Sequence, residues 1–178
     1  MVPKHVVAGL LLATVLFGCG PSRREREAAW LQAFQRDLDA TREKWEADLD
    51  RKWFKNNAQA LRELNARYEQ VYARWFLRID PLSQAILSYS VALASRTDRG
   101  EIGAEEANRL YYKLAADIAL ARPTFPMQAS ETQRDAAMLQ WWEAYWSQHR
   151  ETYQATPGNP IVCRVISDEA RGNLLRCE

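Results

Sequence analysis

From Glu25 to Ile79 the chain contains neither proline nor glycine, and its apolar residues recur at intervals of three and four. This spacing is typical of an amphipathic helix and predicts helical structure throughout the segment. The apolar stripe shifts around the helix axis near Asn56 and Asn57, which are weak helix formers. The pattern therefore fits one long helix or two helices with a turn near Asn56. Because the segment has no strong turn residue, one long helix is the preferred prediction.

Asp80 and Pro81 mark a new helix start, because aspartate is a good N-cap and proline is tolerated in the first helical turn. The segment that follows, LSQAILSYSVALAS, carries small or apolar side chains on nearly every face. Such a helix is expected in the middle of a bundle. A further amphipathic segment ends before Pro123, and Ser130 with Gln133 forms a capping box that begins the last predicted helix.

The segment DRGEIGAEEA, residues 98–107, is rich in acidic side chains and invites comparison with a calcium loop. The spacing of its oxygen ligands does not fit an EF-hand, which needs ligands at alternate positions and a glutamate at the twelfth. The segment is therefore interpreted as a turn between two helices. Its glutamates are favoured near the positive N-terminus of the second helix.

The N-terminal segment has the features of an export signal. A short basic start precedes an apolar stretch, residues 6–17, that is too short to span a membrane but fits the core of a signal peptide. The stretch runs into the residues LFGC, which resemble the lipobox of bacterial lipoproteins. Leu16, Gly18 and Cys19 match that pattern. Phe17 departs from it, because this position is more often small or β-branched.

The resemblance implies a lipid anchor: Cys19 would carry a diacylglyceryl group, and the signal would be removed before it. Gly20, in place of an aspartate, implies an extracytoplasmic protein on the outer membrane, facing the periplasm, in a bacterium with two membranes. Export implies an oxidising compartment, in which Cys163 and Cys177 are expected to form a disulfide. Free thiols or a metal site are the alternatives, and a metal is disfavoured because His149 is the only histidine of the mature chain.

Two short segments near the C-terminus, IVCRVIS and LLRC, are predicted to be strands of a hairpin. The predicted fold class is thus mainly α, with a long N-terminal helix packed on a small helical bundle and a short disulfide-linked C-terminal β-hairpin. The expected organisation is a signal peptide at 1–18, a lipidated tether at 19–27, a helical domain at 28–158 and the disulfide-closed hairpin at 159–178.

Large aromatic residues gather around a histidine in the last predicted helix, at helical spacing: Trp142, Tyr145, Trp146 and His149. These four residues are a candidate ligand surface, because aromatic faces bind the apolar faces of sugars. Their spacing is also that of a buried helix face, and a position in the bundle core is the preferred interpretation.

The chain carries 24 basic and 23 acidic residues, which argues against a nucleic-acid partner. No nucleophile elbow or phosphate-binding glycine loop is present, so no catalytic residue and no cofactor are predicted. The expected function is that of a non-enzymatic structural or protein-interaction component of the cell envelope, with the membrane and another envelope protein as partners. A small-ligand or glycan-binding module that uses the aromatic helix is the alternative, followed by an envelope hydrolase with a carboxylate pair.

Overall fold

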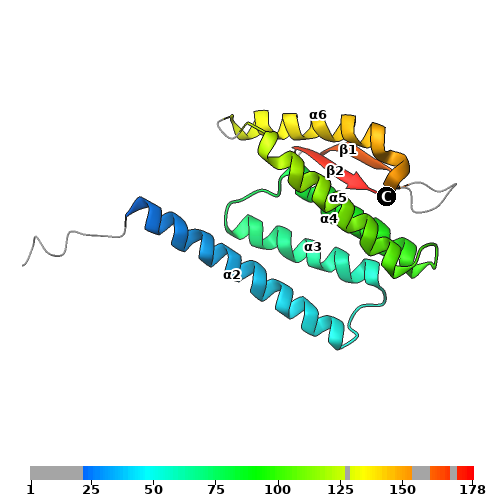
Figure 1. The fold of residues 1–178 in the computed structure, drawn as a ribbon. Coiled ribbons are helices and arrows are strands. Elements are labelled where there is room, and N and C mark those ends of the chain that lie inside the picture. Colours follow the sequence, from blue (N-terminus) through cyan, green and yellow to red (C-terminus); the bar gives the residue numbers. More distant parts are fainter. Residues whose placement is uncertain (1–21, 127–128, 154–160, 169–171) are drawn as a thin grey trace, which may run out of the picture. The chain divides into compact units, whose positions relative to one another are not determined.

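The computed structural model describes residues 22–126, 129–153, 161–168 and 172–178 (Figure 1). The predicted signal peptide (1–18) and the lipidation site Cys19 lie outside the described residues. The chain divides between Ala40 and Thr41 into two compact units, and each is described by itself. In chain order the elements are α2 (Arg23–Asp50), α3 (Asn57–Arg74), α4 (Pro81–Asp98), α5 (Ala104–Ala121), the 3₁₀ helix η1 (Arg122–Thr124), α6 (Glu131–His149), the 3₁₀ helix η2 (Arg150–Tyr153), β1 (Cys163–Asp168) and β2 (Gly172–Cys177).

The first unit contains the start of α2, which begins inside the segment predicted to be a tether (19–27). Ser22 and Glu25 form a capping box: the Glu25 amide donates to Ser22 Oγ at 3.3 Å, and the Ser22 amide donates to Glu25 Oε2 at 2.6 Å. The charged residues after Ser22 are therefore helical rather than extended. Within this unit the rings of Trp30 and Phe34 stack, with their centroids 6.0 Å apart.

The preferred prediction of one helix over residues 25–79 is wrong, because the chain turns between α2 and α3. Asn56 caps α3 by accepting a hydrogen bond from the Gln59 amide at 2.8 Å. The carboxylate of Asp98, from the end of α4, accepts from the amides of Asn57 at 3.1 Å and Ala58 at 2.8 Å. Two caps at one helix start satisfy amides that a continuous helix would bond internally, so they stabilise the break.

α4 is the central element of the second unit, as its small and apolar faces predicted. It contacts α3, α5, α6 and β2 (Figure 1). Its Leu82, Ala85 and Tyr89 are completely buried, and the Tyr89 hydroxyl donates to the carbonyl of Tyr153 at 3.2 Å. The other large side chains that are almost fully buried come from the surrounding elements: Val71, Leu110, Leu114, Ile118, Trp142, Tyr153 and Ile161.

The acidic segment 98–107 forms a turn between two helices, as predicted from its ligand spacing, and not a calcium loop. Gly100 has a φ of 72°, a left-handed conformation that glycine adopts without strain. The Gly100 amide donates to the carbonyl of Thr97 at 3.0 Å, and the Glu101 amide donates to the carbonyl of Arg96 at 2.9 Å. This pair of bonds is the Schellman arrangement that ends a helix. α5 follows after Gly103.

The C-terminal hairpin and its disulfide are confirmed. β1 and β2 pair antiparallel, with Cys163 opposite Cys177. The two cysteines are bonded, and their Cα atoms lie 4.0 Å apart. Both are nearly buried against the core, because β2 packs on α4. A two-stranded sheet is marginal alone in water, so the disulfide and the contact with α4 are what hold it.

Phe76, in the α3–α4 connection, is 98% exposed and has a φ of 54°, which is strained for any residue except glycine. Replacing Phe76 with glycine should relieve that strain at no packing cost and raise the free energy of unfolding by about 0.5–1 kcal/mol. Urea denaturation measures the change. Phe76→Ala removes the ring but keeps the strained backbone, so it should leave stability nearly unchanged. If the glycine variant were no more stable than the alanine variant, the backbone at Phe76 would not be strained.

Candidate functional site

The four residues of the candidate ligand surface do not lie together on an accessible face. Trp142 and Trp146 of α6 are 1% and 7% exposed, which confirms the core interpretation for both. Their indoles stack with centroids 5.1 Å apart, so they offer no free ring to a sugar. Tyr145 and His149 are half-buried and stack on each other at 4.4 Å. His149 Nδ1 lies 3.0 Å from the carbonyl oxygen of Tyr145 in the preceding turn.

Tyr145 belongs instead to a hydrogen-bonded cluster centred on Asp117 of α5. Its hydroxyl bonds to Asp117 Oδ2, which also accepts from Tyr153 at 2.5 Å and from the Lys113 ammonium at 2.9 Å. Partial burial opposes ionisation of Asp117, but these three hydrogen bonds outweigh it and lower the pKa of the carboxyl to about 2. The cluster joins α5, α6 and η2. Its ionised carboxylate accepts all three hydrogen bonds on Oδ2, so one oxygen holds these elements together.

The Asp117 cluster predicts a loss of stability in acid. A carboxyl whose pKa falls from 3.8 to about 2 on folding contributes about 2 kcal/mol above pH 4, and this contribution disappears as the pH falls from about 4 to 2. Burial raises the pKa of Tyr145 and Tyr153, so their contribution is present below pH 10 and is lost above it. Urea denaturation between pH 2 and a pH above 10 measures the loss of stability in acid and the loss in base. In Asp117→Asn the loss of unfolding free energy in acid should be smaller by about 2 kcal/mol. If the variant lost as much stability in acid as the wild type, Asp117 would not be the cause of that loss.

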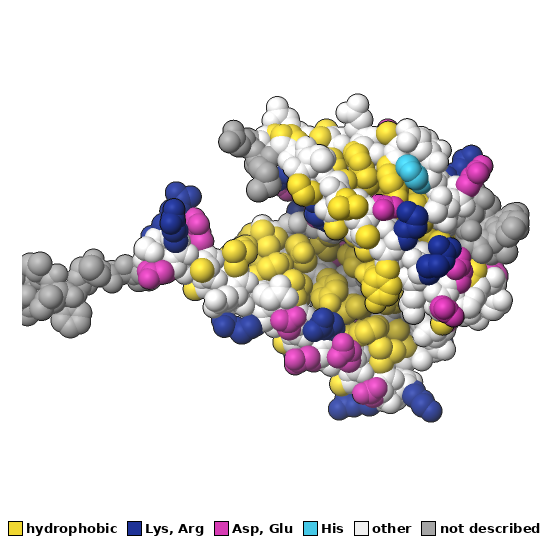
Figure 2. Space-filling view, viewed as in Figure 1, with side chains coloured by type: hydrophobic (Ala, Val, Ile, Leu, Met, Phe, Trp, Pro, Cys, Tyr) yellow, Lys and Arg dark blue, Asp and Glu magenta, His cyan; other side chains and the backbone are white. Residues whose placement is uncertain are grey.

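An open apolar cleft lies in the second unit between α3 and α5, with α4 as its floor. It has a volume of about 680 Å³. Figure 2 shows hydrophobic side chains lining a hollow on the face turned toward the viewer. Tyr112, at its edge, is 68% exposed. The larger side chains that line this apolar cleft are Trp45 from the end of α2, Leu61, Leu64 and Tyr68 from α3, Leu87 and Leu93 from α4, and Tyr111 and Tyr112 from α5.

The α2 end of the apolar cleft is fixed by polar contacts to α3. The indole Nε1 of Trp45 donates to the carbonyl of Ala60 at 2.7 Å. Asp48 accepts from Arg67 at 2.8 Å, and hydrogen bonding to this carboxylate raises the pKa of Arg67. Trp45 is therefore held in place with part of its ring left to the apolar cleft.

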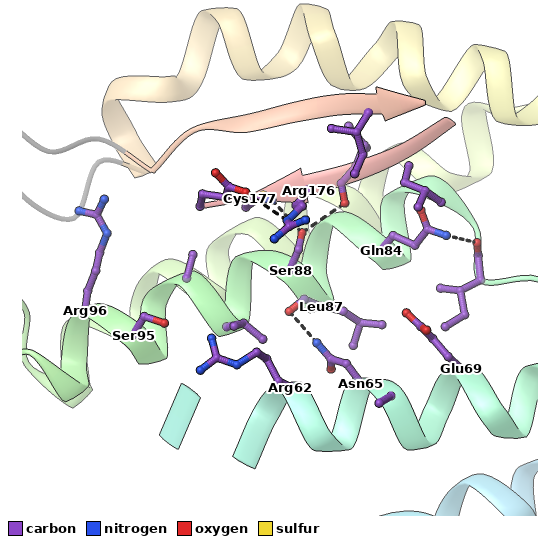
Figure 3. Close-up of a pocket in the computed structure, with 18 of the residues that line it drawn as sticks. Arg62, Asn65, Glu69, Gln84, Leu87, Ser88, Ser95, Arg96, Arg176 and Cys177 are labelled. Atoms are coloured by element: carbon purple, nitrogen blue, oxygen red, sulfur yellow. Dashed lines mark hydrogen bonds and ion pairs between the residues drawn. The ribbon is translucent and has the colours of Figure 1, made fainter. Parts of the chain in front are cut away.

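A second hollow, here called the arginine groove, lies between α3, α4 and β2 and has a volume of about 750 Å³ (Figure 3). Its charged lining comprises Arg62 and Glu69 of α3, Arg96 and Arg99 at the end of α4, Arg176 of β2, and Glu178. Four arginines against two glutamates make this groove positive in a chain that is otherwise nearly neutral. The apolar cleft and the arginine groove share only Asn65 and Leu87 in their linings; the Asn65 amide donates to the Leu87 carbonyl at 3.1 Å.

Ser88 joins β2 to α4 beside the arginine groove. Its hydroxyl donates to the carbonyl of Ala85 within α4 at 3.1 Å. On β2 the hydroxyl lies 3.4 Å from the carbonyl of Leu175 and accepts from the amide of Cys177 at 3.2 Å. These two backbone groups belong to the edge of β2 that does not pair with β1, since Val162 and Glu178 exchange the neighbouring hairpin bonds. The Ser88 side chain thus contacts backbone groups on the unpaired edge of β2.

In the described part of the chain, no three His, Cys, Asp or Glu side chains are grouped so as to hold a metal ion. No helix within those residues is both long and apolar enough to cross a bilayer. Comparison of the chain with protein families, with curated proteins and with solved structures found no match.

Neither hollow could be predicted from the sequence. Each is lined by residues of several elements that are far apart in the chain, and no local motif marks such a surface. The one available signal was residue type: Tyr111 and Tyr112 are adjacent, so a single helix face cannot bury both. Tyr112 is the one left exposed.

Proposed function

We propose that this protein is a lipid-anchored, extracytoplasmic component of a bacterial cell envelope that binds another envelope protein and catalyses no reaction. Acyl chains on Cys19 would hold it at the outer membrane, facing the periplasm, in a bacterium with two membranes. The LFGC residues support the anchor. The disulfide between Cys163 and Cys177 supports the compartment, because such bonds persist outside the reducing cytoplasm.

The observation that carries the protein-binding role is the apolar cleft. Monomeric proteins seldom expose a contiguous apolar surface of this kind unless it binds something. Its lining includes Trp45, Tyr68, Tyr111 and Tyr112, and Trp and Tyr are the residue types enriched where interfaces derive most of their binding energy.

The form of the apolar cleft favours a helix of the partner as the occupant. Its two walls, α3 and α5, are helices of 18 residues each, which corresponds to about 27 Å of length. An amphipathic helix can place residues at positions i, i+3, i+4 and i+7 into such a groove. A lipid tether keeps the protein near partners in the same envelope, which raises their effective concentration.

Site-specific photocrosslinking in living cells tests this role. A benzophenone amino acid at Tyr112, on the edge of the apolar cleft, should give a discrete adduct with one envelope protein. The matched control is Leu120, which lies on the same helix, is 77% exposed and does not line the apolar cleft. Adding Leu64→Glu should reduce the Tyr112 adduct about tenfold, because a buried charge at an interface is costly.

Two results would contradict the proposal. Equal adducts from Tyr112 and Leu120 would mean that the apolar cleft has no special role. An adduct unaffected by Leu64→Glu, in a variant that remains folded by circular dichroism, would mean that the partner is bound elsewhere.

A further inference from the structure

The arginine groove contains two guanidinium groups whose hydrogen bonds are incompletely used. Arg62 is exposed on α3 and makes no ion pair with any residue that the structure describes. Arg96 is 3% exposed, its Nη1 lies 4.0 Å from Glu101 Oε2, and this nitrogen has no hydrogen-bond acceptor. Glu101 Oε2 likewise has no donor, and both atoms are closed to solvent. Arg96 therefore contributes positive charge to the end of the groove rather than an open hydrogen-bond donor.

The acids beside the arginine groove neutralise part of its charge, but not all of it. Arg99 pairs with Glu101, and Arg176 pairs with Glu178 at 3.1 Å. Glu101 therefore forms a close ion pair with Arg99, whereas its distance to Arg96 is 4.0 Å. Burial also lowers the pKa of Arg96, although an arginine remains charged under such a shift. Counting Glu101 with the two lining glutamates, three acids stand against four arginines, so one positive charge is left in excess for an external anion.

The arginines reach the groove from three separate elements. In Figure 3, Arg62 extends from α3 toward α4, Arg96 lies at the end of α4, and Arg176 comes from β2. Toward the other end lie Glu69 and Gln84. The Gln84 amide nitrogen donates to the carbonyl of Ile79 at 3.0 Å, which orients its oxygen away from that carbonyl; this oxygen has no donor.

We propose that the arginine groove binds a small organic oxyanion, a carboxylate or a phosphate ester that also carries hydroxyl or amide groups. The planar guanidinium group matches both oxyanions, because it can donate two parallel hydrogen bonds. The hydroxyl of Ser95, which lines the groove, suits the neutral polar part of such a molecule. A volume of about 750 Å³ falls within the range of small-molecule sites.

This site is separate from the proposed protein-binding surface. The arginine groove and the apolar cleft have only Asn65 and Leu87 in common. Failure of one proposal therefore leaves the other standing, and variants of Arg62 leave the apolar cleft intact.

Three sugars with the same skeleton test the proposal by isothermal titration calorimetry on the full chain in neutral detergent. N-acetylmuramic acid supplies a carboxylate, N-acetylglucosamine 6-phosphate supplies a phosphate, and N-acetylglucosamine supplies neither. At least one of the two anionic sugars should bind with a Kd below about 1 mM. The neutral sugar should bind at least about tenfold more weakly, because it lacks the charge-assisted hydrogen bonds. Which anionic sugar binds more tightly distinguishes a phosphate ligand from a carboxylate ligand.

Substitutions then locate the binding. Arg62→Gln, at an exposed position where folding is not at risk, should weaken the anionic sugar about tenfold. Arg150→Gln is the matched control, since Arg150 is exposed on η2 and does not line the arginine groove; it should leave the Kd unchanged. The proposal is overturned if neither anionic sugar binds with a Kd below about 1 mM, if all three sugars bind equally, or if the two variants weaken binding to the same extent.

Discussion

Replacing Trp142 with alanine should lower the free energy of unfolding by about 3–5 kcal/mol, the largest effect expected of any single side chain here. Trp142 is 1% exposed and stacks on Trp146 in the core between α4 and α6. Removing the indole deletes its buried apolar surface and leaves a cavity that the surrounding helices can only partly fill. Urea denaturation followed by circular dichroism gives the measurement.

Trp53→Ala is the matched control for Trp142→Ala. Trp53 lies in the turn between α2 and α3 and is 70% exposed, so its loss should change stability by no more than about 0.5 kcal/mol. If Trp142→Ala cost less than about 1 kcal/mol, the indole would not be part of the core, and the candidate ligand surface on α6 would need to be reconsidered.

Removing the disulfide should lower the free energy of unfolding by about 3 kcal/mol, as the chain-entropy model gives for a loop of this length. The bond joins residues 14 positions apart and is nearly buried against α4. The double variant Cys163→Ala/Cys177→Ala and the reduced wild type should therefore unfold at a similar, lower urea concentration. Alanine suits both sites because the side chains face the core.

The reductant supplies the control for the disulfide prediction. Dithiothreitol should destabilise the wild type and leave the double variant unchanged, because the variant has no bond to reduce. A wild type whose unfolding is insensitive to the reductant, once thiol titration has shown that its cysteines are free, would contradict a stabilising role.

Local patterns in the sequence were sufficient to predict most of the secondary structure. The small and apolar side chains of α4 indicated a central helix, and the capping box of Ser130 and Gln133 is present at the start of α6. In the helices the apolar residues recur every three or four positions, whereas near the C-terminus they alternate with polar residues. This change indicated the hairpin. These features depend on residues near each other in the chain, which is why a single sequence contains them.

The break between α2 and α3 depends on a residue that is distant in sequence. Asn56 alone is a weak signal, since asparagine also occurs inside helices. Its effect is reinforced by Asp98, whose carboxylate accepts from the amides of Asn57 and Ala58. That contact forms only after α4 has packed, so helical periodicity could not reveal it.

The candidate site was harder to predict for the same reason. The aromatic spacing on α6 was correctly interpreted as a core face for Trp142 and Trp146, but nothing local linked Tyr145 to Asp117, a residue of another helix. The arginine groove likewise needs Arg62 of α3 and Arg176 of β2 in one place. Surfaces of this kind are products of packing between elements.

Mass spectrometry of the intact protein from the membrane fraction tests the central claim, that a disulfide-closed helical body is held to a membrane by lipid. The predicted mass is that of a chain beginning at Cys19, with a diacylglyceryl group and an N-terminal acyl chain added and two hydrogens removed for the Cys163–Cys177 bond. A mass that corresponds to the unmodified chain from Met1, or to a processed chain with a free thiol at Cys19, would contradict the account.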